Sequence, residues 1–392
     1  MKIVGIVLCL IVLLSISTGA GISATSKAFN SEGLKVYSTK NYSLALAYFN
    51  SATAQDPSNI DAWINKGNTQ RALKSYNDSI VSYNKAIELN RTSVDAWIGK
   101  GEAQRSLKLY NDSLVSYSKA LELNNARVDW WVTKGDLQRT LKLYNGSLAS
   151  YNKALELDNT RVDLWVTKGD LQRTLKSYND SIVTYNKAIE LNRTSVNAWV
   201  GKGEAQRSMQ LYNDSMVSYH RAIEINHNST AAWSGLASSY EAQKNYQAAF
   251  SAISNATAIS PKAASYWYRG GYYLQLLGKF QDAAKYFNTA LSIDPKNKDA
   301  LYREGISMQA MGNSSGAIAL YNRTIALDPK YKQAYNAMGL AFEAEGSYSK
   351  AGNAYNMSLG IDPKYGQVMN NMMHTLLALK KYDEAMKLYL KL

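Results

Sequence analysis

The sequence predicts an all-α fold, a solenoid of about eleven helix-turn-helix units, because the chain repeats itself every 34 residues. Tryptophan marks the period, since seven of the eight tryptophans lie 34 residues apart: Trp63, Trp97, Trp131, Trp165, Trp199, Trp233 and Trp267. Glycine recurs four residues after most of these positions. The 392 residues include only five prolines, which break helices, so most of the chain can be helical.

Composition excludes several classes of protein. Apolar residues make up 46% of the chain and charged residues 19%, a balance that forms a core rather than a disordered chain. Cys9 is the only cysteine and lies in the apolar N-terminus, so the repeats have no disulfide, thiolate metal site or cysteine nucleophile. The histidines His220, His227 and His374 lack the spacing of metal ligands. We therefore expect no catalytic residues, no metal and no cofactor.

Residues 1–24 are predicted to direct export. Lys2 gives a basic start, Ile3 to Leu14 is an unbroken apolar run, and Ala20 or Ala24 offers a small residue for signal-peptidase cleavage. The alternative is an uncleaved N-terminal anchor, because about 20 apolar residues span a bilayer. In either case the repeats are predicted to be extracytoplasmic: secreted, at the cell surface, or anchored to the cytoplasmic membrane.

Each repeat is predicted to contain two packed helices. The aromatic residue and the glycine share one face of the first helix, where the glycine leaves a dent. The second helix carries a small residue, then in most repeats an aromatic residue four positions later, so it can approach that dent closely. We expect Ser147, for example, to enter the dent at Gly135. In the connecting turn, such as Lys74 to Asn77, asparagine is predicted to cap the second helix.

Residues 26–392 resemble the tetratricopeptide repeat family. The resemblance rests on W-x3-G in the first helix, [A/S]-x3-[Y/F]-x2-A in the second and Asp-Pro after several repeats, all at a 34-residue period. It implies a right-handed superhelix and a non-enzymatic protein that binds a protein or peptide in a concave groove lined by the first helices. We number the repeats one to eleven, with the aromatic residue at position 4 of each.

The repeats form two groups. Repeats one to six, residues 26–229, have a polar groove, and repeats two to six are nearly identical through internal duplication, whereas repeats seven to eleven, residues 230–392, are richer in tyrosine and methionine. Repeats two to six depart from the family at positions 7 and 11: Lys66, Lys100, Lys134, Lys168, Lys202 and Gln70, Gln104, Gln138, Gln172, Gln206. These polar residues either loosen the packing between the helices, or the aliphatic part of each lysine covers an apolar surface while its ammonium group stays in solvent.

Candidate ligand residues occupy the groove positions that the resemblance implies. Arginine stands at position 12 of repeats two to six, with acids at positions 2 and 9: Arg71, Arg105, Arg139, Arg173, Arg207, Asp61, Asp95, Asp129, Asp163, Glu102, Asp136, Asp170 and Glu204. One interpretation is ion pairing between residues three apart, worth about 0.2–0.5 kcal/mol each. The other is a track for an extended peptide, because arginine suits carboxylates and backbone carbonyls.

Two further surfaces are candidates for binding. A more aromatic groove segment is built of residue types that anchor interfaces: Tyr268, Arg269, Tyr272, Tyr302 and Arg303. The last helix, Tyr382 to Leu392, is predicted to expose Leu388 and Leu390 as well as Leu392, without a polar capping helix. That end is expected to bind a partner or another copy of the chain.

Glycosylation motifs of the form N-x-[S/T] occur 13 times: Asn41, Asn77, Asn90, Asn111, Asn145, Asn179, Asn192, Asn213, Asn228, Asn255, Asn313, Asn322 and Asn356. At position 18 of repeats two to six, helix capping by the asparagine is an alternative explanation. Capping does not explain the motif at Asn90 or Asn228, and export would supply the compartment. We therefore expect some of the sites to be glycosylated.

The predicted function is that of an adaptor or scaffold on the outer side of the cytoplasmic membrane. One alternative is a glycosylated structural or self-assembling spacer at the cell surface. Another, prompted by a net charge of +13, is a charge-driven binder of acidic polymers or lipid headgroups. Nucleic acid is not an expected partner, because Lys85 and Lys119 stand beside Glu88 and Glu122. Membrane contact is expected only through residues 1–24, if they are retained.

Overall fold

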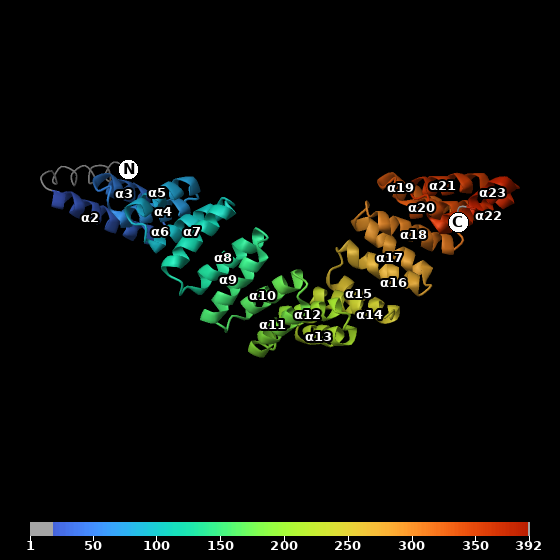
Figure 1. Ribbon diagram of the computed structural model, residues 1–392, viewed down its shortest axis with the longest axis horizontal. Coiled ribbons are helices and arrows are strands. Elements are labelled where there is room, and N and C mark those ends of the chain that lie inside the picture. Colours follow the sequence, from blue (N-terminus) through green and yellow to red (C-terminus); the bar gives the residue numbers. More distant parts are fainter. Residues whose placement is uncertain (1–18, 391–392) are drawn as a thin grey trace. The chain divides into compact units, whose positions relative to one another are not determined.

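The computed structural model describes residues 19–390, which form 22 helices and no strand (Figure 1). This confirms the predicted all-α fold and its eleven helix-turn-helix repeats. The helices are α2 (Gly19–Ser38), α3 (Tyr42–Gln55), α4 (Ile60–Ala72), α5 (Tyr76–Leu89), α6 (Val94–Ser106), α7 (Tyr110–Leu123), α8 (Val128–Thr140), α9 (Tyr144–Leu157), α10 (Val162–Thr174), α11 (Tyr178–Leu191), α12 (Val196–Ser208), α13 (Tyr212–Ile225), α14 (Thr230–Ala242), α15 (Tyr246–Ile259), α16 (Ala264–Leu276), α17 (Phe280–Ile293), α18 (Lys298–Ala310), α19 (Ser314–Leu327), α20 (Lys332–Ala344), α21 (Tyr348–Ile361), α22 (Gly366–Ala378) and α23 (Tyr382–Tyr389).

The chain divides between Lys176 and Ser177 into two compact units, which we call the N-terminal body (α2–α10) and the C-terminal body (α11–α23). Within each body, successive helices pack into pairs, such as α4 with α5, and each second helix also packs against the next first helix. The division at residues 229 and 230 rests on composition and remains a prediction.

Five of the first helices begin with a side-chain cap: α4, α6, α12, α14 and α18. Asn59 accepts a hydrogen bond from the amide of Ala62, and Ser93 caps α6 in the same way. The second helices α5, α7, α9, α11 and α13 begin without such a cap. The predicted capping by asparagine at position 18 is wrong, because α5 already begins at Tyr76 and Asn77 lies inside its first turn. The same holds for the equivalent residues Asn111, Asn145, Asn179 and Asn213.

The first helices end in Schellman turns. After α4, the amide of Ser75 donates to the carbonyl of Gln70 at 2.8 Å and that of Lys74 donates to Arg71 at 2.9 Å. Lys74 consequently has a left-handed backbone, with φ of +62°. Seven other repeats place a side-chain-bearing residue there, Lys40, Lys108, Lys142, Lys176, Gln210, Lys244 and Lys380, while three place Gly278, Gly312 and Gly346. The turn needs a positive φ, for which glycine is the residue of lowest cost.

The core is organised around the tyrosine at position 24. Tyr83 is fully buried between Gly67 of its own repeat and Gly99 of the next first helix. A Cβ atom on Gly67 would lie 2.7 Å from the ring, and one on Gly99 would lie 2.4 Å from it. The glycine dent therefore receives the tyrosine ring rather than the small residue.

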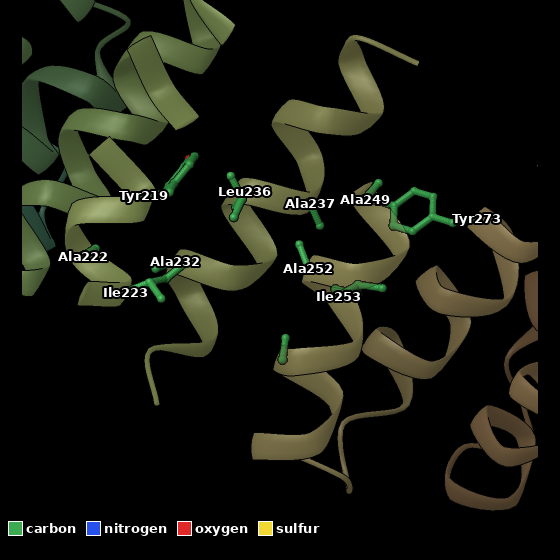
Figure 2. Close-up of a cluster of buried hydrophobic side chains, with 11 residues drawn as sticks. Tyr219, Ala222, Ile223, Ala232, Leu236, Ala237, Ala249, Ala252, Ile253 and Tyr273 are labelled. Carbon is green, nitrogen blue, oxygen red and sulfur yellow. The ribbon is translucent and has the colours of Figure 1, made fainter. Parts of the chain in front are cut away.

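Ser147 shows what the small residue does instead. Its hydroxyl donates a hydrogen bond of 2.8 Å to the carbonyl of Gly135, while the ring of Tyr151 fills the space above that glycine. The prediction that serine enters the dent is thus corrected. The C-terminal body also packs a position-24 tyrosine against the next repeat. Tyr219 of α13 lies in one apolar cluster with Leu236 of α14 and Ile253 of α15 (Figure 2).

Candidate functional site

The lysines at position 7 lie over the tryptophans at position 4. The ammonium of Lys66 is 4.8 Å from the ring centroid of Trp63, and the other four pairs are 5.1–5.3 Å apart. Partial burial lowers the pKa of Lys66. Of the two interpretations left open by the sequence, the structure favours the one in which the lysine stem covers an apolar surface, with a cation–π contact added.

Four of the five glutamines at position 11 link the two helices of a pair, whereas the buried Oε1 atom of Gln172 accepts no hydrogen bond in the described residues. Gln104 accepts a hydrogen bond of 2.6 Å from the hydroxyl of Ser116, and both side chains are buried. Equivalent bonds join Gln70 to Ser82, Gln138 to Ser150 and Gln206 to Ser218. A buried polar pair therefore replaces the aromatic contact usual in the family.

We expect Gln104→Ala to lower the free energy of unfolding by about 1–3 kcal/mol, because it leaves the buried Ser116 hydroxyl without an acceptor. Gln104→Leu combined with Ser116→Ala is expected to recover most of that loss. Urea unfolding of Gln104→Leu, of Ser116→Ala and of the double variant measures the coupling. Additive losses would show that the bond contributes nothing.

A groove in the N-terminal body brings several predicted residues together. A cavity of about 420 Å³ is lined by Asp61, Arg71, Asp95 and Glu102, which the sequence predicted, together with Asn30, Asn65 and Asn68. An adjoining cavity of about 320 Å³ shares Arg71 and Glu102 and adds Arg105, Tyr37 and Tyr76. Asn30 and Asn65 were missed as candidates, although they stand at positions 5 and 6, which the family uses for its groove.

The predicted arginines differ in their partners. Arg71 pairs with Glu102 of the next repeat, whereas Arg139 pairs with Asp136 of its own repeat at 3.3 Å. Arg173 pairs with Asp170 at 3.6 Å, also within its repeat. Arg105 is exposed and forms no ion pair within residues 19–390. Arg207 and Glu204 both lie in α12, which belongs to the C-terminal body. Pairing between residues three apart is therefore present at Arg139 and Arg173, and the ligand track stays a prediction.

Tyrosine hydroxyls reach the groove from the core. The hydroxyl of Tyr83 donates to Asn68 at 2.8 Å, and that of Tyr151 donates to Asp136 at 2.7 Å. Burial raises the pKa of Tyr83 to about 12, so its hydroxyl keeps its proton at neutral pH. The position-9 side chains of Asn68 and Asp136 are therefore held in place by the buried tyrosines that bond to them.

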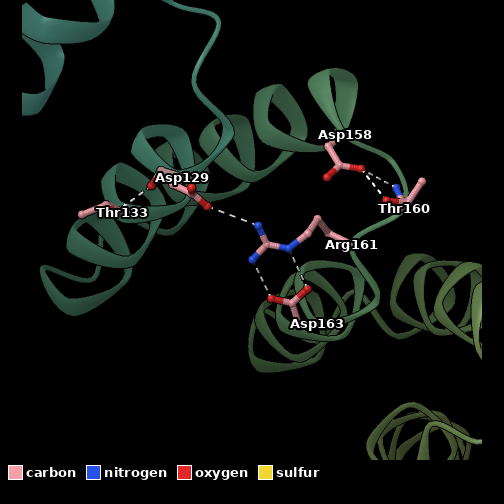
Figure 3. Close-up of polar contacts among 6 residues, drawn as sticks. All are labelled: Asp129, Thr133, Asp158, Thr160, Arg161 and Asp163. Atoms are coloured by element: carbon pink, nitrogen blue, oxygen red, sulfur yellow. Dashed lines mark hydrogen bonds and ion pairs between the residues drawn. The ribbon is translucent and has the colours of Figure 1, made fainter.

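Arg161, which the sequence did not suggest as a candidate, joins two of the predicted acids at position 2. Its guanidinium makes two hydrogen bonds to Asp163, of 2.8 and 3.0 Å, and one of 3.3 Å to Asp129 (Figure 3). This contact lowers the pKa of the Asp163 carboxyl. Among the predicted acids at position 2, Asp129 and Asp163 thus neutralise a cation of the protein itself, whereas Asp61 and Asp95 form no ion pair in the described part of the chain.

The aromatic segment of the C-terminal body is held together by internal bonds. Arg269 donates to Ser234, Ser238 and the hydroxyl of Tyr273 at 2.7–2.8 Å, and Tyr273 donates to Glu241 at 2.6 Å. Arg303 stacks over Tyr272 at 4.2 Å and bonds to Gln275 and Tyr268. Tyr302 is half-buried against Tyr321 and Tyr331. The two arginines therefore brace neighbouring first helices.

The glycosylation motifs are mostly at the surface. Eleven of the 13 asparagines are exposed, and Asn90 and Asn255 are half-buried. Asn41, Asn245 and Asn313 cap second helices with their side chains, and two of these, Asn41 and Asn313, belong to motifs. The serine of the motif at position 20 of repeats two to six, such as Ser79, is fully buried.

The last helix exposes a different apolar stripe from the predicted one. Leu390 is 77% exposed, as expected, but Leu388 is half-buried, and Leu392 lies outside the described residues. Tyr382, Met386 and Tyr389 are instead 60–63% exposed and follow one another at helical spacing.

The N-terminal prediction cannot be followed into the structure, because residues 1–18 lie outside its described part. Ala20 and Ala24, the proposed cleavage positions, lie at the start of α2, before the first fully buried residue, Ser26. Between residues 19 and 390, no helix combines the length and apolar character needed to cross a bilayer. The same residues contain no cluster of side chains that would hold a metal ion.

Comparison with known proteins identifies the repeats. Models of the tetratricopeptide repeat match residues 60–93, 129–161, 162–195, 234–298 and 274–340. Similar solved structures include YrrB, described as a TPR protein with an unusual peptide-binding site, with 18% identity and a TM-score of 0.44 over 47% of this chain and 96% of that chain. They also include MamA, with 21% identity and 0.40 over 42% and 96%, and a tetratricopeptide repeat protein from Parabacteroides merdae, with 12% identity and 0.45 over 64% and 98%. No curated protein matches the sequence.

Proposed function

This chain belongs to the tetratricopeptide repeat family, whose arrays are protein-interaction scaffolds, and we propose that it is a non-enzymatic adaptor that binds an extended peptide segment of a partner protein. The proposed binding site is the groove across α2, α4 and α6 of the N-terminal body. The proposal puts the repeats on the outer side of the cytoplasmic membrane, with residues 1–24 as a signal peptide or anchor.

The observation that carries the proposal is the chemistry of the cavity of about 420 Å³. The amide of Asn65 donates to the carbonyl of Asn30 at 3.0 Å, and the carbonyl of Asn68 accepts from Tyr83. The amides of Asn30 and Asn68 and the side-chain carbonyl of Asn65 form no hydrogen bond within the described residues, and such groups suit the alternating acceptors and donors of a peptide backbone. Asp61 and Asp95 add two carboxylates without an ion-pair partner in the described residues. We therefore expect the bound segment to carry a basic side chain that is neutralised by these two acids.

Asp61→Asn combined with Asp95→Asn is expected to weaken binding of such a peptide at least tenfold, while thermal unfolding stays within a few degrees of the original. The ligand is a basic extended peptide selected from a displayed random library against the full chain, and fluorescence anisotropy measures its Kd. Glu88→Gln combined with Glu122→Gln is the matched control, because both acids are exposed and paired with lysine on the second helices. Equal loss in both double variants would contradict a groove site and indicate attraction by net charge alone.

The spacer alternative is favoured by one observation, the exposed stripe Tyr382, Met386 and Tyr389 on α23. A self-assembling spacer predicts a mass that grows with protein concentration and stops growing when Met386 is replaced by glutamate. An adaptor predicts a constant mass. Light scattering over a range of concentrations separates the two.

A further inference from the structure

A second surface, distinct from the groove, lies along one edge of the N-terminal body. The edge consists of the turns between the first and second helices, residues 39–41, 73–75, 107–109 and 141–143. Because consecutive helix pairs stack side by side, these turns follow one another along the same edge. We call this surface the turn edge.

The lysines of the turn edge carry charge that the protein does not neutralise. Lys74, Lys108 and Lys142 are exposed, and none forms an ion pair within residues 19–390. By contrast, Lys85, Lys119 and Lys153 on the second helices each pair at 2.6–2.7 Å with a glutamate three residues away. The neighbouring acids Asp78 and Asp112 act electrostatically on Lys66 and Lys100 respectively.

The same lysines occupy strained backbone positions. Lys74, Lys108 and Lys142 have φ of +60° to +62°, a region that disfavours a side chain, and glycine fills the same position at Gly278. Duplication does not account for every such lysine, because Lys40, Lys244 and Lys380 lie in repeats outside the near-identical group. Within residues 19–390, none of these side chains forms an ion pair, a hydrogen bond or a ring contact that would compensate the strain, which points to a role outside the fold.

Exposed leucines flank the turn lysines. Leu73, Leu109 and Leu143 are 36%, 44% and 50% exposed, directly beside Lys74, Lys108 and Lys142 in the sequence. A soluble polyanion gains little from apolar side chains. A bilayer surface accommodates both kinds, with lysines among anionic headgroups and leucines at the boundary of the acyl chains.

We propose that the turn edge of the N-terminal body binds the surface of a lipid bilayer that carries anionic headgroups. The edge supplies one unpaired lysine per repeat, and at three of the four turns a neighbouring exposed leucine, so each contact is weak and the array adds them together. The contact is peripheral and separate from residues 1–24, so the proposal adds a second membrane contact to the one that the sequence predicts. It would hold the array against the membrane while leaving the groove, formed by the bodies of the first helices, available to a peptide.

The test places a fluorescent label on the turn edge of the full chain. Cys9→Ser removes the native thiol, and Leu143→Cys, in the turn before α9, accepts an environment-sensitive fluorophore. Asn152→Cys, within α9, provides the control position, which is also exposed. Vesicles of phosphatidylcholine with an equal part of phosphatidylglycerol are compared with vesicles of phosphatidylcholine alone. Because the label reports the edge directly, insertion of residues 1–24 does not imitate the signal.

The expected result is a blue shift at Leu143→Cys on the anionic vesicles, a smaller shift at Asn152→Cys, and loss of the shift in 0.5 M salt. Lys74→Gly, Lys108→Gly and Lys142→Gly together should weaken vesicle binding at least tenfold while thermal unfolding stays the same or rises, because glycine relieves the strained turns. Lys85→Gln, Lys119→Gln and Lys153→Gln remove the same charge from the second helices and should leave the shift in place.

Three outcomes would overturn the proposal. Equal shifts on neutral and anionic vesicles would show that headgroup charge is not recognised. Equal shifts at Leu143→Cys and Asn152→Cys would show that the turn edge is not the contact. A shift of the same size with heparin would assign the edge to soluble polyanions. None of these results affects the peptide-binding test, because Asp61→Asn and Asp95→Asn do not alter the turn edge.

Discussion

Gly135→Leu is expected to lower the free energy of unfolding by at least about 3 kcal/mol and to unfold the fourth helix pair first. A Cβ atom at Gly135 would lie only 2.5 Å from the ring of Tyr151. That ring is fully buried and its hydroxyl is bonded to Asp136, so it cannot turn away without breaking a second contact. The helices α8 and α9 would have to separate.

Denaturant unfolding measures the total effect, and hydrogen exchange locates it. Because each repeat contacts only its neighbours, amides of α8 and α9 should lose protection while those of α20 and α21 keep theirs. Gly360→Ala is the matched control, since no atom lies within 4 Å of the added Cβ, and alanine is expected to stabilise α21 by about 0.5–1 kcal/mol. A neutral Gly135→Leu would refute the packing of Tyr151 on this glycine.

Arg269→Met is expected to destabilise the C-terminal body by about 3 kcal/mol. The guanidinium is half-buried and donates to two serine hydroxyls of α14 and to Tyr273. Methionine fills a similar volume but leaves those acceptors without a donor, and hydrogen bonds to a charged group contribute about 1.5–3 kcal/mol each without being additive. Helices α14 and α16 would lose their main polar connection.

Arg221→Met is the control for charge removal. Arg221 pairs with Glu224 at the surface, with both side chains 60% exposed, so its loss should change stability by less than about 0.5 kcal/mol. Chemical unfolding of both variants provides the comparison. If the two losses were equal, Arg269 would be an ordinary surface residue and available to a ligand, as the sequence had suggested.

The fold was predictable because its signal is local and repeated. The spacing of Trp63, Gly67 and Tyr83 determines which faces of the two helices pack together within one repeat. The 34-residue period then places the same pair of packed faces in each following repeat. The helix start at Tyr76 was harder to predict, because the Schellman turn after α4 places Lys74 in the left-handed region and lets α5 begin earlier than the asparagine pattern suggests.

The candidate site was predictable only in part, because its main contacts join different repeats. Arg71 pairs with Glu102, 31 residues away, rather than with an acid of its own helix. Arg161 bridges Asp129 and Asp163 in the same manner. Residue spacing within a helix predicts the local pairs at Arg139 and Arg173, but contacts between neighbouring first helices depend on how closely those helices approach.

The tyrosine at position 24 also bears on how such an array changes length during evolution. Tyr83 needs Gly99 from the following repeat, Tyr219 needs Gly235, and Tyr117 meets Thr133. Any stretch of 34 residues copied within the near-identical group after Asn65 carries one tyrosine at position 24 and one glycine or threonine at the position that contacts such a tyrosine, wherever the stretch begins. A tandem copy therefore packs against its neighbours through the same contact between tyrosine and small residue that the other repeats use. Recombination can lengthen or shorten the array without requiring a new packing arrangement.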